Sequence, residues 1–293
     1  MEKTTKLLPT ASVCAVVIAV IFRVFQLLVT VDYNEMGFYS ADAGFLSTWG
    51  LYVFLVIAAA VFIAAAVKDN KSMNTAFLCN KDSLTPKQTA VLGISFLVGA
   101  CLKFYVLVFN FKGIGLDFLG EGVIFLVFAA IGFVLLGSRK IKAGIGYLML
   151  IISISYTLKA AALFMQDTII TRVSDELILL LSYVSAVFFF LSLGRFISTN
   201  EGKGTRHKLL IFSAVSACLS SCASLAGCIA YLIDSEYMKD HTDIHPVSEI
   251  GVIILAFAVL FVLYGKKAET DTDNENDENK KTDENAADEM PSV

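Results

Sequence analysis

The chain has 293 residues, of which 56% are apolar and only 17% are charged, and its formal net charge is −4. A soluble domain of this length carries more charge and fewer unbroken apolar runs, so the composition excludes an ordinary soluble fold. The sequence also lacks a basic patch interleaved with aromatic residues, which argues against nucleic-acid binding.

Eight apolar stretches, each close to the roughly 20 residues that an α-helix needs to cross a bilayer, follow one another along the chain. They are apolar on all faces, whereas the strands of a membrane barrel alternate apolar and polar residues. The sequence therefore predicts an all-α integral membrane bundle of eight helices, arranged as four hairpins. The predicted spans are Leu7–Val31, Phe45–Val67, Thr89–Phe109, Phe118–Gly137, Ala143–Phe164, Leu177–Ile197, Leu209–Ile233 and Glu249–Gly265.

Basic residues gather in every second gap between these stretches. Because Lys and Arg favour cytoplasmic loops, this alternation predicts that both termini are cytoplasmic. The four other connectors together hold only Lys112, Arg172 and Lys239. The fourteen basic residues of the predicted cytoplasmic side are Lys3, Lys6, Lys68, Lys71, Lys81, Lys87, Arg139, Lys140, Lys142, Lys203, Arg206, Lys208, Lys266 and Lys267.

The C-terminal segment differs in composition from everything before it. Between Glu269 and Glu289 it holds ten acidic residues and almost nothing apolar. Such a segment cannot bury enough surface to offset the entropy of ordering. We therefore expect a transmembrane domain over residues 1–267 and a disordered acidic cytoplasmic tail over residues 268–293.

Helix boundaries and interiors carry recognisable signals. Thr85 and Pro86 form a typical helix start, with a capping side chain followed by proline at the first helical position. The four prolines avoid every predicted span interior, which favours continuous helices over the broken helices of many transporters. The seventh stretch is rich in small residues, which predicts close packing at the centre of the bundle or at a homodimer contact. These residues include Ser213, Ser216, Ser220, Ser224 and Gly227.

Charged residues inside apolar spans are the best candidates for a functional site. Arg23, Lys103 and Lys159 each lie about two-thirds of the way along an odd-numbered span. A charge at the centre of a membrane helix costs roughly 2.5–3.5 kcal/mol on insertion scales, so each one requires an explanation. The functional hypothesis is a shared, partly wet cavity that opens to the outer side and binds an anionic solute or a lipid headgroup. Glu121 and Glu176, near the starts of the following spans, would set the charge state of the bases.

A purely structural reading of the same residues is also available. Long basic side chains in the outer halves of their helices can extend toward the headgroups. Glu121, Glu176 and Glu249 stand near helix N-termini, where the helix dipole favours a carboxylate. A base and an acid of one hairpin can also simply pair. The spacing recurs in three hairpins, with Asp42 following Arg23, and this recurrence suggests a duplicated hairpin.

No motif predicts a cofactor, a metal or a catalytic residue. The sequence lacks a phosphate-binding loop, an HExxH pair and a nucleophile elbow. His241 and His245 stand among carboxylates in an outer connector, which is more typical of a solvated turn than of a metal site. Cys218 and Cys222 lie one helical turn apart, but no further ligand accompanies them at zinc spacing, so we expect packing residues.

Two classes of function remain open at this stage. The first is a non-enzymatic protein that binds or moves a small anionic solute or lipid along the intramembrane bases. The second is an accessory or scaffold protein whose helices pack against other membrane proteins. Lysines lining one cavity would favour the first, whereas bases paired hairpin by hairpin and an exposed stripe of small residues would favour the second. The short loops suggest a bacterial plasma membrane.

Overall fold

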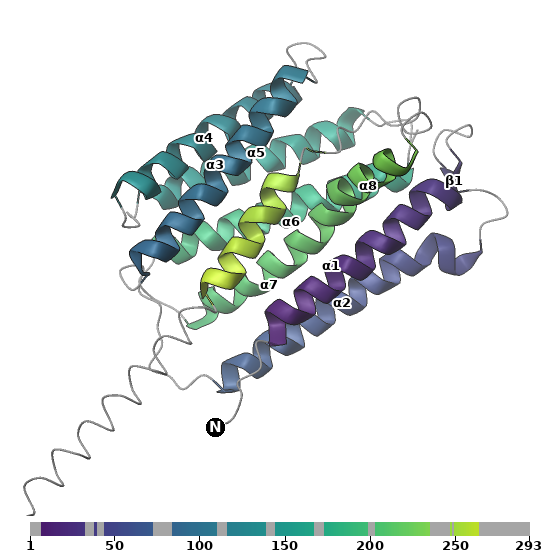
Figure 1. The fold of residues 1–293 in the computed structure, drawn as a ribbon, viewed down its shortest axis with the longest axis horizontal. Helices are drawn as coiled ribbons and strands as arrows, with labels where there is room; N and C mark the ends of the chain where they lie inside the picture. The colour runs from purple at the N-terminus through teal and green to yellow at the C-terminus, as the bar shows by residue number, and fades with distance from the viewer. Residues whose placement is uncertain are drawn as a thin grey trace, which may run out of the picture.

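The computed structural model describes residues 7–32, 38–39, 44–72, 84–109, 116–138, 144–166, 173–198, 203–234, 247 and 249–263. Within these ranges the chain is helical apart from one small ribbon (Figure 1). The helices are α1 (Leu7–Phe25), α2 (Phe45–Ser72), α3 (Pro86–Phe109), α4 (Leu116–Ser138), α5 (Ile145–Gln166), α6 (Val173–Ser198), α7 (Lys203–Ser220) and α8 (Ala226–Ile233). A further apolar helix, Ile250–Leu263, is called the C-terminal helix below.

Seven helical segments in the described ranges are long and apolar enough to cross a membrane, so this is a multi-pass membrane protein by length and composition. α1 continues into a π-helical segment, η1 (Gln26–Thr30), and α7 continues through a second one, η3 (Ser221–Leu225), into α8. The spans agree with the predicted ones to within a few residues. The number eight and the cytoplasmic placement of the termini stay predictions.

The start of α3 shows how local sequence sets a helix boundary. The backbone N–H of Thr85 donates to Oε1 of Gln88 at 2.9 Å, and the N–H of Gln88 donates to Oγ1 of Thr85 at 3.3 Å. This reciprocal pair is a capping box, and Pro86 occupies the first helical position. The predicted helix start is confirmed.

The described part of the C-terminal helix covers most of the predicted span Glu249–Gly265. Its described 14 residues rise about 21 Å, which is less than the roughly 30 Å of a bilayer core. It runs between α3 and α7 (Figure 1), and its residues Val252, Leu255 and Leu260 are fully buried. It is therefore an internal element of the bundle over the part that the structure describes.

Both ends of this short helix are fixed by side chains from other helices. At its start, the N–H of Glu249 donates to Oγ of Ser224 in η3 at 3.0 Å. At its end, Gln88 donates to the carbonyl of Val262 at 3.1 Å and Arg206 donates to that of Leu263 at 3.0 Å. The terminal groups of a helix lack partners of their own, so these contacts satisfy them inside the bundle.

Two features depart from the simple helices that the sequence predicts. π-helical segments are rare and frequently occur at functional sites, and here they interrupt the first and seventh spans. After η1 the chain forms a two-residue strand, β1 (Val31–Asp32), which pairs antiparallel with β2 (Phe38–Tyr39). The absence of proline from the spans predicted continuous α-helices, but a π-turn needs no proline and leaves no comparable sequence signal.

The small residues of α7 and η3 pack inside the molecule. Ser213, Ser216, Ser220 and Ser224 are fully buried, and Ser220 Oγ lies 3.0 Å from Ser182 Oγ of α6. α7 contacts α1, α2 and α6. Central packing is therefore confirmed. The four serines are covered within one chain, and the alternative, a homodimer contact through this stretch, stays a prediction.

Candidate functional site

Four ionisable side chains from four helices meet at one buried point, which is called the charged centre below. It consists of Lys103 on α3, Glu121 on α4, Lys159 on α5 and Glu249 at the start of the C-terminal helix. The exposed fractions of the residues are 0%, 7%, 2% and 0% in that order. Such burial is rare for charged residues unless they are paired.

Glu249 holds the centre together. Its Oε1 accepts hydrogen bonds from Lys103 Nζ at 3.0 Å and from Lys159 Nζ at 3.4 Å. Its Oε2 accepts one from the hydroxyl of Tyr156 at 2.9 Å. Together with the bond from its own N–H to Ser224, these contacts join α3, α5, η3 and the C-terminal helix around one carboxylate.

Glu121 faces the same two lysines from the other side. Lys159 Nζ donates to its Oε1, and Lys103 Nζ lies 3.2 Å from Oε1 and 2.9 Å from Oε2. The contact to Oε2 is an ion pair without hydrogen-bond alignment, so Oε2 accepts no hydrogen bond from the part of the chain that the structure describes. Each lysine therefore touches both carboxylates, and the formal charge of the centre is zero.

Two tyrosines cover the lysines on one side. Lys159 Nζ lies 4.3 Å from the ring centre of Tyr183 and 5.4 Å from that of Tyr156. Lys103 Nζ lies 5.5 Å from the ring centre of Tyr156. A cation near an aromatic face is attracted by the ring quadrupole, more strongly when water is absent. The rings thus replace part of the hydration that the ammonium groups lose.

Glycines allow the helices to approach closely around the centre. A Cβ on Gly251 would lie 2.9 Å from the Cα of Gly99, so the C-terminal helix and α3 touch backbone to backbone. A Cβ on Gly120 would lie 3.1 Å from Cγ of Lys159. The missing side chain at position 120 leaves room for the lysine to reach across α4 to Glu121.

The structure brings three of the five predicted site residues together, namely Lys103, Lys159 and Glu121. The other two, Arg23 and Glu176, lie elsewhere. Arg23 is buried and donates to Oε1 of Gln26 at 3.2 Å. Gln26 in turn donates to the carbonyls of Ser47 and Thr48, which ties α1 to α2. Glu176 is partly exposed at the start of α6.

The pairing lies only partly within hairpins. Lys103 contacts Glu121 of its own hairpin, whereas Lys159 contacts Glu121 and Glu249, which follow the third and seventh spans. From the sequence, Glu249 was given only a structural role and Tyr156 was not named. A signal existed for both: Glu249 stands at a predicted span start like Glu121, and Tyr156 precedes Lys159 by three residues, which places both on one helix face.

Among the described residues, the histidines and cysteines do not form a metal site. His241 and His245 lie outside the described residues. Among the residues that are described, no three or more His, Cys, Asp and Glu side chains group in a way that could hold a metal ion. Cys218 and Cys222 are buried free thiols.

A comparison with known protein families, curated proteins and solved structures finds no match to this chain. The inference of function therefore starts from the charged centre itself.

Proposed function

We propose that the protein binds a small inorganic or carboxylate anion at the charged centre and carries it across the plasma membrane together with a proton. The observation that supports this proposal is that Lys103 and Lys159 are each held between the same two carboxylates. Intramembrane ionisable residues commonly mark solute paths and proton relays.

A contribution to stability does not by itself explain why four charged side chains are buried together. Removing charges from water costs several kcal/mol per ion, and well-packed apolar residues often replace a buried ion pair at no loss of stability. Most of the buried side chains of the bundle are apolar, for example those of Phe128, Ile131 and Phe189, which are fully buried. Four ionisable side chains at one point are therefore better explained by a function that uses their charge.

Charge balance indicates what accompanies the anion. The resting centre has two positive and two negative groups, so a bound anion adds uncompensated negative charge in a buried place, one unit for a monovalent anion and two units for a divalent one. Each carboxylate that takes up a proton cancels one unit and frees the lysines that it held. We assign this proton to Glu121, because it is 7% exposed and Glu249 is 0% exposed, so a proton reaches Glu121 more readily.

The described groups that contact these two glutamates belong to α3, α5 and η3. They are Lys103 of α3, Lys159 and Tyr156 of α5, and Ser224 of η3. Tyr183 of α6 contacts Lys159. An anion that enters therefore replaces carboxylate contacts at the two ammonium groups and leaves the tyrosines in place.

Transport by the purified full-length protein in liposomes tests this proposal. The liposomes contain a pH-sensitive dye, the membrane potential is clamped with potassium and valinomycin, and labelled phosphate, sulfate or succinate is added outside. We expect at least one of the three anions to enter and to acidify the interior. Lys103→Gln and Lys159→Gln should each reduce the uptake rate at least tenfold, and Glu121→Gln should allow uptake without acidification.

Lys87→Gln is the matched control because Lys87 lies exposed at the other end of α3. Each variant must elute as the same single species as the unmodified protein before its rate is compared. Uptake that survives in both lysine variants, or the absence of anion-driven acidification with all three probes, would contradict the proposal.

The accessory or scaffold function has less support. For this function we expected an exposed stripe of small residues on the seventh span, but the serines of that stripe are buried. The placement of both termini in the cytoplasm and the bacterial plasma membrane belong to this proposal as predictions. The acidic tail over residues 268–293 lies outside the described residues.

A further inference from the structure

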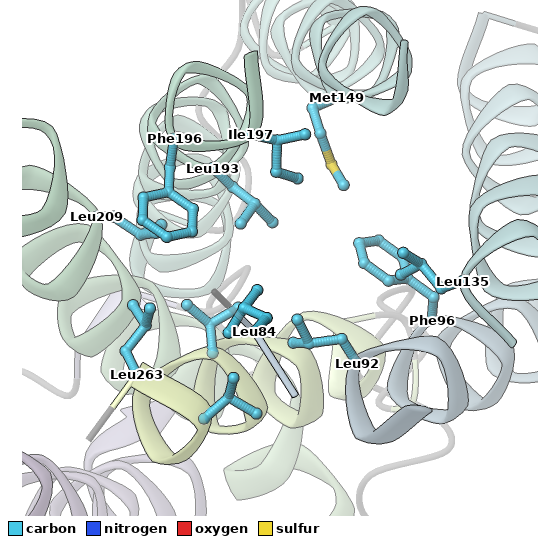
Figure 2. A pocket seen from close by; sticks show the side chains of 12 residues that line it. Leu84, Leu92, Phe96, Leu135, Met149, Leu193, Phe196, Ile197, Leu209 and Leu263 are labelled. Atoms are coloured by element: carbon cyan, nitrogen blue, oxygen red, sulfur yellow. The ribbon is translucent and has the colours of Figure 1, made fainter. Parts of the chain in front are cut away.

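A second feature of the bundle lies apart from the charged centre. Side chains from α3, α4, α5, α6, α7 and the C-terminal helix surround a pocket with about 420 Å³ of unfilled space, including the part open to its surroundings. Figure 2 shows these side chains directed toward a common space, and every one of them is apolar.

Aromatic rings separate this pocket from the charged centre. Phe96 lines the pocket and packs edge-on against Phe128 at 5.4 Å between ring centres. Phe128 contacts Phe190 at 5.7 Å, and Phe190 stacks on Tyr156 at 5.7 Å. Tyr156 in turn bonds Glu249. The pocket is thus separate from the charged centre. It lies near the starts of α3, α5 and α7, which are cytoplasmic by the predicted orientation.

A buried arginine borders the pocket. Arg206 is 9% exposed, and its Nη2 donates to the carbonyl of Leu263, a residue that lines the pocket. Leu209, another lining residue, lies three positions further along α7 and therefore on the same helix face. The Nε–H of Arg206 donates no hydrogen bond within the described part of the chain. A buried donor without an acceptor is unfavourable and rare.

We propose that the pocket binds one alkyl chain of an anionic amphiphile whose head group accepts a hydrogen bond from Arg206. A ligand with an apolar chain and an anionic head would contact the apolar side chains of the pocket and give the Nε–H of Arg206 the acceptor that it lacks among the described residues. Lys208 is exposed two residues from Arg206 and adds positive charge at the same end of the bundle. Basic pockets between helices on the cytoplasmic side of a membrane suit anionic head groups.

Binding to the full-length protein in a neutral detergent tests the site. Native mass spectrometry is used with three probes, namely palmitate, phosphatidylglycerol and phosphatidylcholine. We expect saturable binding of at least one of the two anionic probes and at least tenfold weaker binding of phosphatidylcholine. Palmitate alone would indicate a free fatty acid, and phosphatidylglycerol alone would indicate a membrane lipid. Equal binding of all three, or of none, would overturn the proposal.

Two variants and their controls assign the binding to this pocket. Leu193→Phe fills the space, and Leu150→Phe makes the same change at an exposed position of α5. Arg206→Gln removes the guanidinium, and Arg195→Gln does so at an exposed position of α6. We expect each pocket variant to weaken binding of the anionic probe at least tenfold and each control to leave it unchanged. Unchanged binding in Leu193→Phe would overturn the assignment.

A measurement on the unmodified protein covers the case in which a variant fails to fold. Palmitate with a photoreactive group at the end of its chain is bound and irradiated, and the labelled peptides are mapped. We expect labels on residues that line the pocket, such as Phe96, Leu193 and Val259. Labels confined to lipid-facing residues outside the pocket would overturn the proposal.

Discussion

Lys103 on α3 and Glu249 at the start of the C-terminal helix form a buried ion pair 3.0 Å long across 146 positions of sequence. This pair fixes the depth at which the C-terminal helix enters the bundle. It also connects α3 to the lysine of α5, because Lys159 shares the same carboxylate oxygen. The fold and the proposed function both depend on this arrangement.

The bond from the N–H of Glu249 to Ser224 gives a first prediction. Ser224→Ala leaves that buried N–H without its acceptor and is expected to lower the free energy of unfolding by about 1–3 kcal/mol. The measurement is thermal or denaturant unfolding of the purified protein in detergent. Ser155→Ala is the control, because that hydroxyl bonds only the carbonyl of Ile151 one turn earlier in its own helix. A loss at Ser224 no larger than at Ser155 would count against the assigned contact.

The backbone contact between Gly251 and Gly99 gives a second prediction. Gly251→Ala places a Cβ 2.9 Å from the Cα of Gly99, and backbone cannot move aside as a side chain can. We expect a loss of about 1–3 kcal/mol in unfolding free energy, the usual cost of overpacking. Gly122→Ala is the control, since nothing lies within 4 Å of its added Cβ. There the change should be neutral or slightly stabilising, because alanine favours helix more than glycine does. Equal effects at the two positions would refute the close approach.

The orientation in the membrane gives a third prediction. Lys87 lies exposed in the first turn of α3, and Asp234 directly follows α8 at the opposite end of the bundle. In a background without other cysteines, Asp234→Cys should react with a membrane-impermeant maleimide added to intact cells. Lys87→Cys should react only after the membrane is permeabilised. The reverse pattern would show that the cytoplasmic and outer sides, assigned from the basic residues, are the wrong way round.

The sequence was sufficient for the helices and for part of the charged centre. Apolar runs located the spans, because the length of a membrane helix is set by the bilayer. The cost of a charge in lipid singled out Lys103 and Lys159. The serines of the seventh stretch predicted its central position, because small residues permit close helix contact.

The partners of the lysines could not be obtained in the same way. Periodicity places residues on a face of their own helix, but it does not say which helix packs against that face. Glu249 contacts Lys103 across 146 positions of sequence, so the contact depends on tertiary packing alone.

The central claim is that Lys103 and Glu249 are energetically coupled within one buried centre. A double-mutant cycle of unfolding free energy, made with Lys103→Gln, Glu249→Gln and the double variant in detergent, measures this coupling most directly. Each single change leaves unpaired charge in the interior and should cost about 3–5 kcal/mol. The double variant should cost less than the sum of the two, with a coupling energy of about 1–3 kcal/mol. Additive effects of the two changes would contradict the account.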